Sequence, residues 1–234
     1  TTSPGGTYVD VAANSLFNFG TNNAFSWATW VKADASISND RAAIITNTYD
    51  GQLNPDGWQV ISYNKVLYFE LLRSTSPAYY YDVNSNAVAP FASSNWVHIA
   101  GTYDASNTDA GMTIYVDGVD QSNSRTSNGD WSAHQPDYTD VNFRIAAKSH
   151  GSTAVNWRKW NGLIDEVSVW SGSLNQANIT SLAAGAKANA IAPTSSVVAS
   201  NGDWLTPAPA SKLGTYSMHF PGGGGIGAEQ YISC

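Results

Sequence analysis

The chain has 234 residues, of which 42% are hydrophobic and only 12% are charged, and its formal net charge is -7. This length suffices for one large domain with a sizeable core plus a remnant. The scarcity of Lys and Arg excludes a nucleic-acid binder, which needs basic clusters. No apolar run approaches the roughly 18 residues that span a bilayer, which argues against membrane insertion. The single cysteine, Cys234, excludes an internal disulfide framework.

Short strands separated by turns are predicted along the first half of the chain. The segment 49–57 carries Asp-Gly twice and predicts a turn-rich loop. Asn64 and Lys65 lie between two apolar runs and predict a hairpin turn. The predicted strands, each alternating or rich in apolar and aromatic residues, are 8–11, 24–32, 42–46, 58–63, 66–72 and 79–83.

The second half of the chain predicts further strands and a single helix. Strands are expected at 96–103, 112–116, 143–147 and 160–170, whereas 123–138 reads as a long polar loop. Asn175 is a candidate helix N-cap, and Leu174 and Ile179 have the spacing of a hydrophobic staple. This order predicts an all-β antiparallel jelly-roll sandwich with one short C-terminal helix.

The predicted strand 160–170 carries an acidic residue among apolar ones. Strict alternation places Asp165 on the same face as Leu163, Val167 and Val169, and that face is expected to meet the core. A carboxylate there requires a metal, a cation or backbone N–H donors. Asp165 is therefore a candidate for one of these partners.

Three regions are expected along the chain. Residues 1–190 form the jelly roll, and the Ala-, Pro- and Ser-rich segment 191–212 reads as a linker. Residues 213–234 repeat the order of the N-terminal segment and predict the first strands of a second copy. They can equally complete this sheet or exchange with a neighbour. We expect the chain to be a segment of a longer, multi-domain protein.

Three segments carry a resemblance to a known family. Residues 25–32, the hairpin formed by 96–103 and 114–118, and the strand 161–170 resemble successive parts of laminin-G-like, concanavalin A-like lectin/glucanase jelly-roll domains. Such modules occur in bacterial surface and phage virion proteins. The resemblance covers about residues 5–185 and implies the fold, but it leaves function open because this fold serves lectins, adhesion modules and glycanases.

The resemblance also implies a structural Ca²⁺ at Asp165, held with backbone carbonyls near Gly5 and Gly6. Thr7 stands where an acidic residue would match. A backbone or basic partner for Asp165 is the alternative.

No catalytic residue is predicted. Glycanases of this fold carry a Glu-x-Asp-x-x-Glu pattern, but Leu163 and Ser168 occupy the outer positions around Asp165. Glu70 has no acidic neighbour in sequence with which to share acid–base work. His98 reads as a satisfied sheet histidine. The chain is expected not to be an enzyme, with a glycoside hydrolase as the alternative.

Aromatic and polar side chains in loops and on strand faces predict a glycan site. The candidate ligand-binding residues are Tyr79, Tyr81, Trp131, His134, Trp157 and Arg158. The sequence thus predicts a non-catalytic carbohydrate-binding or adhesion module of a larger extracellular, cell-surface or virion protein, with glycans or neighbouring subunits as partners. A purely structural assembly module is the first alternative, and a glycan-processing enzyme is the second.

Overall fold

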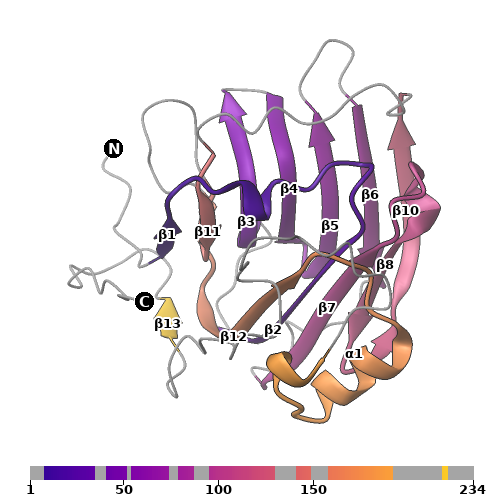
Figure 1. The fold of residues 1–234 in the computed structure, drawn as a ribbon. Coiled ribbons are helices and arrows are strands. Elements are labelled where there is room, and N and C mark those ends of the chain that lie inside the picture. The colour runs from indigo at the N-terminus through magenta and orange to yellow at the C-terminus, as the bar shows by residue number, and fades with distance from the viewer. Residues whose placement is uncertain are drawn as a thin grey trace, which may run out of the picture.

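Two antiparallel sheets pack face to face in the computed structural model of the chain (Figure 1). The structure describes residues 8–34, 41–51, 54–73, 79–86, 95–129, 141–148, 158–191 and 218–220. For 49–51, 54–55, 79 and 218–220 it describes the backbone only.

The seven-stranded sheet has the order β1-β11-β3-β4-β5-β6-β10, and the six-stranded sheet has the order β13-β12-β2-β7-β8-β9. The strands of the first are β1 (Val9–Val11), β11 (Phe143–Ile145), β3 (Ala42–Gly51), β4 (Asn54–Tyr63), β5 (Val66–Arg73), β6 (Tyr79–Ser85) and β10 (Ser122–Asn128). Those of the second are β13 (Met218–Phe220), β12 (Gly162–Trp170), β2 (Phe25–Ala33), β7 (Val97–Tyr103), β8 (Met112–Val116) and β9 (Val119–Asp120). Helix α1 spans Gln176–Ala183, and single 3₁₀ turns lie at Ser15–Phe17, Asp109–Gly111 and Ala188–Ala190. The predicted all-β jelly roll with one short helix is confirmed.

Large aromatic side chains fill the space between the sheets. Trp27 of β2 and Phe69 of β5 meet edge to face across the interface, with ring centroids 5.5 Å apart. Both rings are fully buried. Gly101 of β7 lies beneath the Trp27 indole, where an added Cβ would come within 2.5 Å of the ring. The core therefore depends on alternating inward residues from both sheets.

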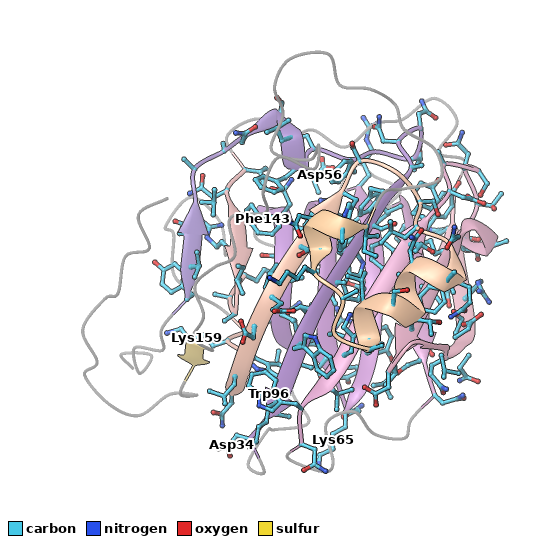
Figure 2. All side chains as sticks on the ribbon, turned by 60° about the horizontal axis from the view of Figure 1, so that its bottom comes forward. Asp34, Asp56, Lys65, Trp96, Phe143 and Lys159 are labelled. Carbon is cyan, nitrogen blue, oxygen red and sulfur yellow. The ribbon has the colours of Figure 1, made fainter. Side chains whose placement is uncertain are left out.

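Helix α1 lies across the outer face of the six-stranded sheet (Figure 2). The side chain of Asn175 caps its first turn by accepting from the backbone N–H of Asn178 at 2.9 Å. Leu174 and Ile179 are both buried in one cluster, as the predicted staple requires. The Ser26 hydroxyl fixes the approach to the helix, because it donates to the carbonyl of Gly172 and accepts from the N–H of Leu174. Among the described residues, no helix has the length and apolarity needed to cross a bilayer.

Parts of two predicted loops are strand instead. Residues 49–51 belong to β3 and residues 54–57 belong to β4, and the two strands pair as far as Gly51 and Asn54. The polar segment 122–128 forms β10, an edge strand with mostly exposed side chains. Because neither face of β10 is buried, its sequence shows no apolar alternation, which explains why it reads as a loop.

Two hairpin turns have left-handed backbone, and the one at Asn64 and Lys65 lies where the sequence predicts it. Asn64 and Lys65 have φ angles of 51° and 62°, and Asp117 and Gly118 have 48° and 80°. Two successive left-handed residues are the conformation of a type I′ turn, which matches the twist of the flanking strands. Lys65 marks one such turn at the end of the sandwich (Figure 2).

Strand β12 breaks the strict alternation predicted for it. Its pairing with β2 shifts between Asp165 and Ser168, and Glu166 takes a φ of 51° there. Ile164 points into the core before this bulge, whereas Val167 and Val169 pack against the core after it. The expectation that Asp165 shares their face is therefore wrong, because a bulge inserts one residue and inverts the side-chain order.

The tail contributes one short strand to this domain. β13 pairs antiparallel with β12 at the edge of the six-stranded sheet, with His219 opposite Leu163. Of the roles predicted for residues 213–234, this pairing corresponds to completion of the sheet. The division into a jelly roll, a linker and a second copy or exchanged tail stays a prediction.

Candidate functional site

A continuous row of polar residues crosses the outer face of the seven-stranded sheet. The register pairs one residue from each strand with the next, and paired residues of an antiparallel sheet point to the same side. We call this set the polar row; in order across the sheet it consists of Asp10, Arg144, Thr46, Gln59, Glu70, Asp82 and Thr126. Their neighbours along the strands, such as Trp58, Phe69 and Val83, point into the core. The row therefore lies on the side away from the core.

The row is exposed at both ends and buried in the middle. Asp10 and Thr126 are exposed, while Gln59 is 1% and Glu70 is 6% exposed. At one end, the Arg144 guanidinium meets the Asp10 carboxylate at 3.0 Å. Within the described ranges, neither Glu70 nor Asp82 forms such an ion pair. The carboxylate at this end of the row is therefore paired with a cation, whereas, among the described residues, the two acids at the centre are not.

The centre of the row joins an amide to two carboxyl groups. The Gln59 amide donates a hydrogen bond to Glu70 Oε2, and Glu70 lies directly opposite Asp82. Burial and, to a smaller extent, the Glu70 carboxylate raise the pKa of Asp82 to about 6, although Arg41 lowers it. The Asp82 side chain is consequently only partly ionised just below neutral pH.

Tyrosine rings flank these acids on the same outer face. Tyr68 lies two residues before Glu70 on β5, and its ring centroid is 6.3 Å from that of Tyr63. Tyr63 is 37% exposed, and the Arg41 guanidinium lies 5.3 Å from its ring centroid. Tyr80, paired with Leu72, adds a half-buried ring on the other side of the row. Rings beside hydrogen-bonding groups suit a ligand with both apolar and polar surface.

Of the candidate residues predicted from sequence, the structure describes the side chains of Tyr81 and Arg158. Tyr81 is 4% exposed in the core, and its hydroxyl donates to the carbonyl of Asn107. Arg158 is half-buried, with a φ of 55°, and its carbonyl accepts from the N–H of Ala43. The side chain of Tyr79 and all of Trp131, His134 and Trp157 lie outside the described residues. Their role in a glycan site stays a prediction.

Asp165 lies near the β12 bulge, on the opposite sheet from the polar row. Its Oδ1 accepts from the N–H of Glu166 at 2.8 Å, and its carbonyl accepts from the Thr29 hydroxyl at 2.8 Å. A backbone donor thus meets the carboxylate, as one of the predicted alternatives had it. No group of three His, Cys, Asp or Glu side chains within the described ranges could hold a metal ion. Gly5 and Gly6 lie outside those ranges, and the Ca²⁺ site stays a prediction.

Sequence reasoning missed the central acids of the row. Glu70 and Asp82 are 12 positions apart, and only the pairing of β5 with β6 makes them neighbours. The available signal was that each acid interrupts an apolar strand on its outward side. The paired register that joins them depends on the connection at 74–78, which local patterns do not encode.

Comparisons with known proteins agree with the fold. Residues 3–180 match the family model of the concanavalin A-like lectin/glucanases superfamily. No curated protein sequence matches the chain. Among solved structures, the carbohydrate-binding module CBM40 of the Ruminococcus gnavus IT-sialidase is similar with a TM-score of 0.53 and 13% identity, covering 78% of this chain and 98% of that one. The same module bound to α2,3-sialyllactose gives 0.51 and 13%, with coverages of 78% and 97%.

The binding domain of Paraclostridial Mosquitocidal Protein 1 is also similar, with a TM-score of 0.49 and 15% identity. That match covers 75% of this chain and only 40% of the other.

Proposed function

Because the chain belongs to the concanavalin A-like lectin/glucanase superfamily, we propose that it is a non-catalytic carbohydrate-binding module that holds glycans on the outer face of its seven-stranded sheet. The observation that carries this proposal is the polar row with its flanking tyrosines on a face that the described helix does not cover. The Ruminococcus gnavus module bound to sialyllactose is an example of a glycan held by this fold.

The chemistry of the face suits a sugar. A pyranose ring presents C–H groups on one side, which stack on aromatic faces, and hydroxyls around its edge, which hydrogen-bond to carboxylates and amides. Tyr63 and Tyr68 supply the rings, and Glu70 and Asp82 supply the acceptors, with Tyr68 two residues before Glu70 on β5. The proposal therefore requires that a sugar stacked on Tyr68 gain access to the buried Glu70 and to the half-buried Asp82.

A binding assay with a matched control tests this proposal. We expect saturable binding on a glycan array, and at least a tenfold loss of affinity in Tyr63→Ala. Trp96→Ala is the control, because Trp96 is also 37% exposed but precedes β7 of the other sheet. Equal losses in both variants, or binding that persists in Tyr63→Ala and disappears on replacing Trp131 or Trp157, would move the site to the loops predicted from sequence.

A glycan-processing enzyme is the second candidate, and the Glu70–Asp82 pair favours it. A carboxyl group with a pKa near 6 suits a general acid, and a second carboxylate beside it can act as nucleophile or base. Release of reducing ends from an oligosaccharide that Glu70→Gln and Asp82→Asn each abolish would replace the binding function with catalysis. Binding without turnover supports the module.

The setting of the module is part of the same proposal. We place it in a larger extracellular, cell-surface or virion protein, where it adheres to glycans or to neighbouring subunits. Repeating the array after chelation tests the proposed Ca²⁺ at Asp165, since binding that depends on the metal would be lost.

A further inference from the structure

The centre of the polar row has more hydrogen-bond acceptors than donors. Gln59, Glu70 and Asp82 lie in register on three neighbouring strands. The Gln59 amide nitrogen is used by Glu70, and the Thr46 hydroxyl on the other side donates away from the row to the carbonyl of Ala147. The described residues therefore supply fewer donors than acceptors at the centre of the row.

Two of these acceptors are buried without a partner among the described residues. They are Gln59 Oε1, on a side chain that is 99% buried, and Asp82 Oδ1. A buried acceptor without a donor costs about 1–3 kcal/mol, and more when it is charged. The two oxygens lie on either side of Glu70, and both lack a donor within the described part of the chain. A ligand that brings N–H or O–H donors would satisfy both.

We propose that this face selects glycans that carry a free, positively charged amino group, and that the run Gln59–Glu70–Asp82 binds that group. The inference rests on the proposed glycan-binding function and specifies its ligand class. A primary ammonium offers three donors and one positive charge. It can therefore satisfy the unpartnered oxygens and separate two like-charged carboxylates at the same time.

A metal ion fits this run less well than an ammonium. Ca²⁺ takes six to eight oxygen ligands at 2.3–2.6 Å, usually from loops that wrap around it. Three side chains in a line on a sheet provide too few ligands, and within the described part of the chain no third His, Cys, Asp or Glu joins the pair in a metal-binding group. An amino group needs only a few acceptors on one side, which is what a sheet face provides.

The flanking rings favour an amino sugar over a lysine side chain. Tyr63 and Tyr68 lie beside the acids with their centroids 6.3 Å apart, and Tyr63 is partly exposed. A pyranose ring places its amino group directly beside a stackable C–H face. A lysine carries its ammonium at the end of a flexible chain and would leave these rings uncovered.

Three tetrasaccharides with one backbone test the inference. Chitosan tetramer, chitotetraose and cellotetraose share the β-1,4 linkage and differ only at C2, which carries an ammonium, an acetamide or a hydroxyl. Calorimetric titration of the full chain at pH 6.5 is expected to give at least tenfold tighter binding of the chitosan tetramer than of either other ligand. The preference should fall at least fivefold in Asp82→Asn and in Glu70→Gln. Asp120→Asn, which removes an exposed acid on β9, should keep it.

Each other result contradicts a specific part of the inference. Equal affinities for the three tetramers, all weakened by Tyr63→Ala, would overturn the amine preference and leave the glycan-binding function standing. A trilysine peptide that binds as tightly as the chitosan tetramer would overturn the assignment to amino sugars. A preference that Asp120→Asn reduces as much as Asp82→Asn would mean that net charge, rather than the Gln59–Glu70–Asp82 run, attracts the amine. If no tetramer binds, the amine inference fails, and the glycan array alone then decides the proposed function.

Discussion

The two outer faces of the sandwich are built for different purposes. On the six-stranded sheet, Ala28 and Ala100 are small enough for α1 to approach, and Ile179 and Leu182 of the helix pack onto them. On the seven-stranded sheet, the corresponding outward positions carry the polar row. A helix cannot cover a buried amide and two carboxyl groups without leaving them unsatisfied, whereas a ligand with matching donors can.

The difference shows how one fold separates stability from binding. The apolar face gains free energy by excluding water, and its residues are expected to tolerate substitution poorly. The polar face retains two buried acceptors that no described residue satisfies, and such groups lower the stability of the fold. Substitutions on the two faces should therefore have effects of different size and even of opposite sign.

The largest expected effect comes from the covered face. Ile179→Ala removes a fully buried side chain between α1 and the sheet and should lower the free energy of unfolding by about 2–5 kcal/mol. Urea denaturation followed by tryptophan fluorescence measures this change. Ser181→Ala, on the exposed side of the same helix, is the control and should stay within about 0.5 kcal/mol. Similar losses in both variants would mean that the substitutions weaken the helix itself, rather than its apolar contact with the sheet.

A histidine beside the covered face should make the protein sensitive to acid. Burial lowers the pKa of His98 to about 4, although Asp117 and Glu166 raise it, and the imidazole packs edge-on against the Trp30 ring. The unfolded chain, with a pKa near 6.5, binds the proton more readily between these values, so stability should fall as the pH drops from about 6.5 to 4. The loss attributable to His98 should be about 3 kcal/mol.

Comparing the unfolding midpoints of the wild type and His98→Gln across this range isolates the contribution of His98. The variant should lose less stability on acidification. An imidazole that titrates near 6.5 by NMR in the folded protein would contradict the prediction.

Much of the fold could be predicted because its strands alternate. Strands β2, β7 and β12 begin and end within two residues of the predicted segments, since each has one side that must be buried. Strand β10 was missed because it is an exposed edge. The run Tyr79 to Tyr81 has no alternation to show which ring faces the core, and the structure buries Tyr81 and directs Tyr80 outward.

For the candidate site, the sequence predicts the class of ligand but not the residues that bind it. Aromatic and polar side chains predict a glycan site, but the sequence does not specify which acids become neighbours. Gln59, Glu70 and Asp82 come from three strands, and their meeting depends on two hairpin registers. A shift of one residue in either register would turn the acids toward the core, so their alignment is a property of the whole sheet.

The helix cap should give a smaller effect than the apolar contact. Asn175→Ala removes the side-chain acceptor for the N–H of Asn178 and should lower the free energy of unfolding by about 1 kcal/mol. Asn175→Ser keeps a capping oxygen and should restore most of the loss. Differential scanning calorimetry can resolve both changes. If the serine variant is as unstable as the alanine variant, the cap is not the source of the effect.

The smallest expected effect, and the only stabilising one, lies on the polar face. Because the pKa of Asp82 is raised to about 6 in the folded protein, while an unfolded aspartate titrates near 3.9, ionisation of this group opposes folding as the pH rises between these values. Asp82→Asn removes the ionisation while Glu70, Arg41 and Asp109 still face the position. The variant should match the wild type near pH 4 and exceed its stability by about 0.5–1 kcal/mol above pH 6, after allowance for partial solvent exposure. Thermal unfolding at both pH values measures the difference.

Acid should therefore destabilise the molecule through His98 and stabilise it through Asp82. A variant that is less stable than the wild type at pH 7 would show that the ionised carboxylate has a folding role, and the polar face could then no longer be regarded as reserved for a ligand.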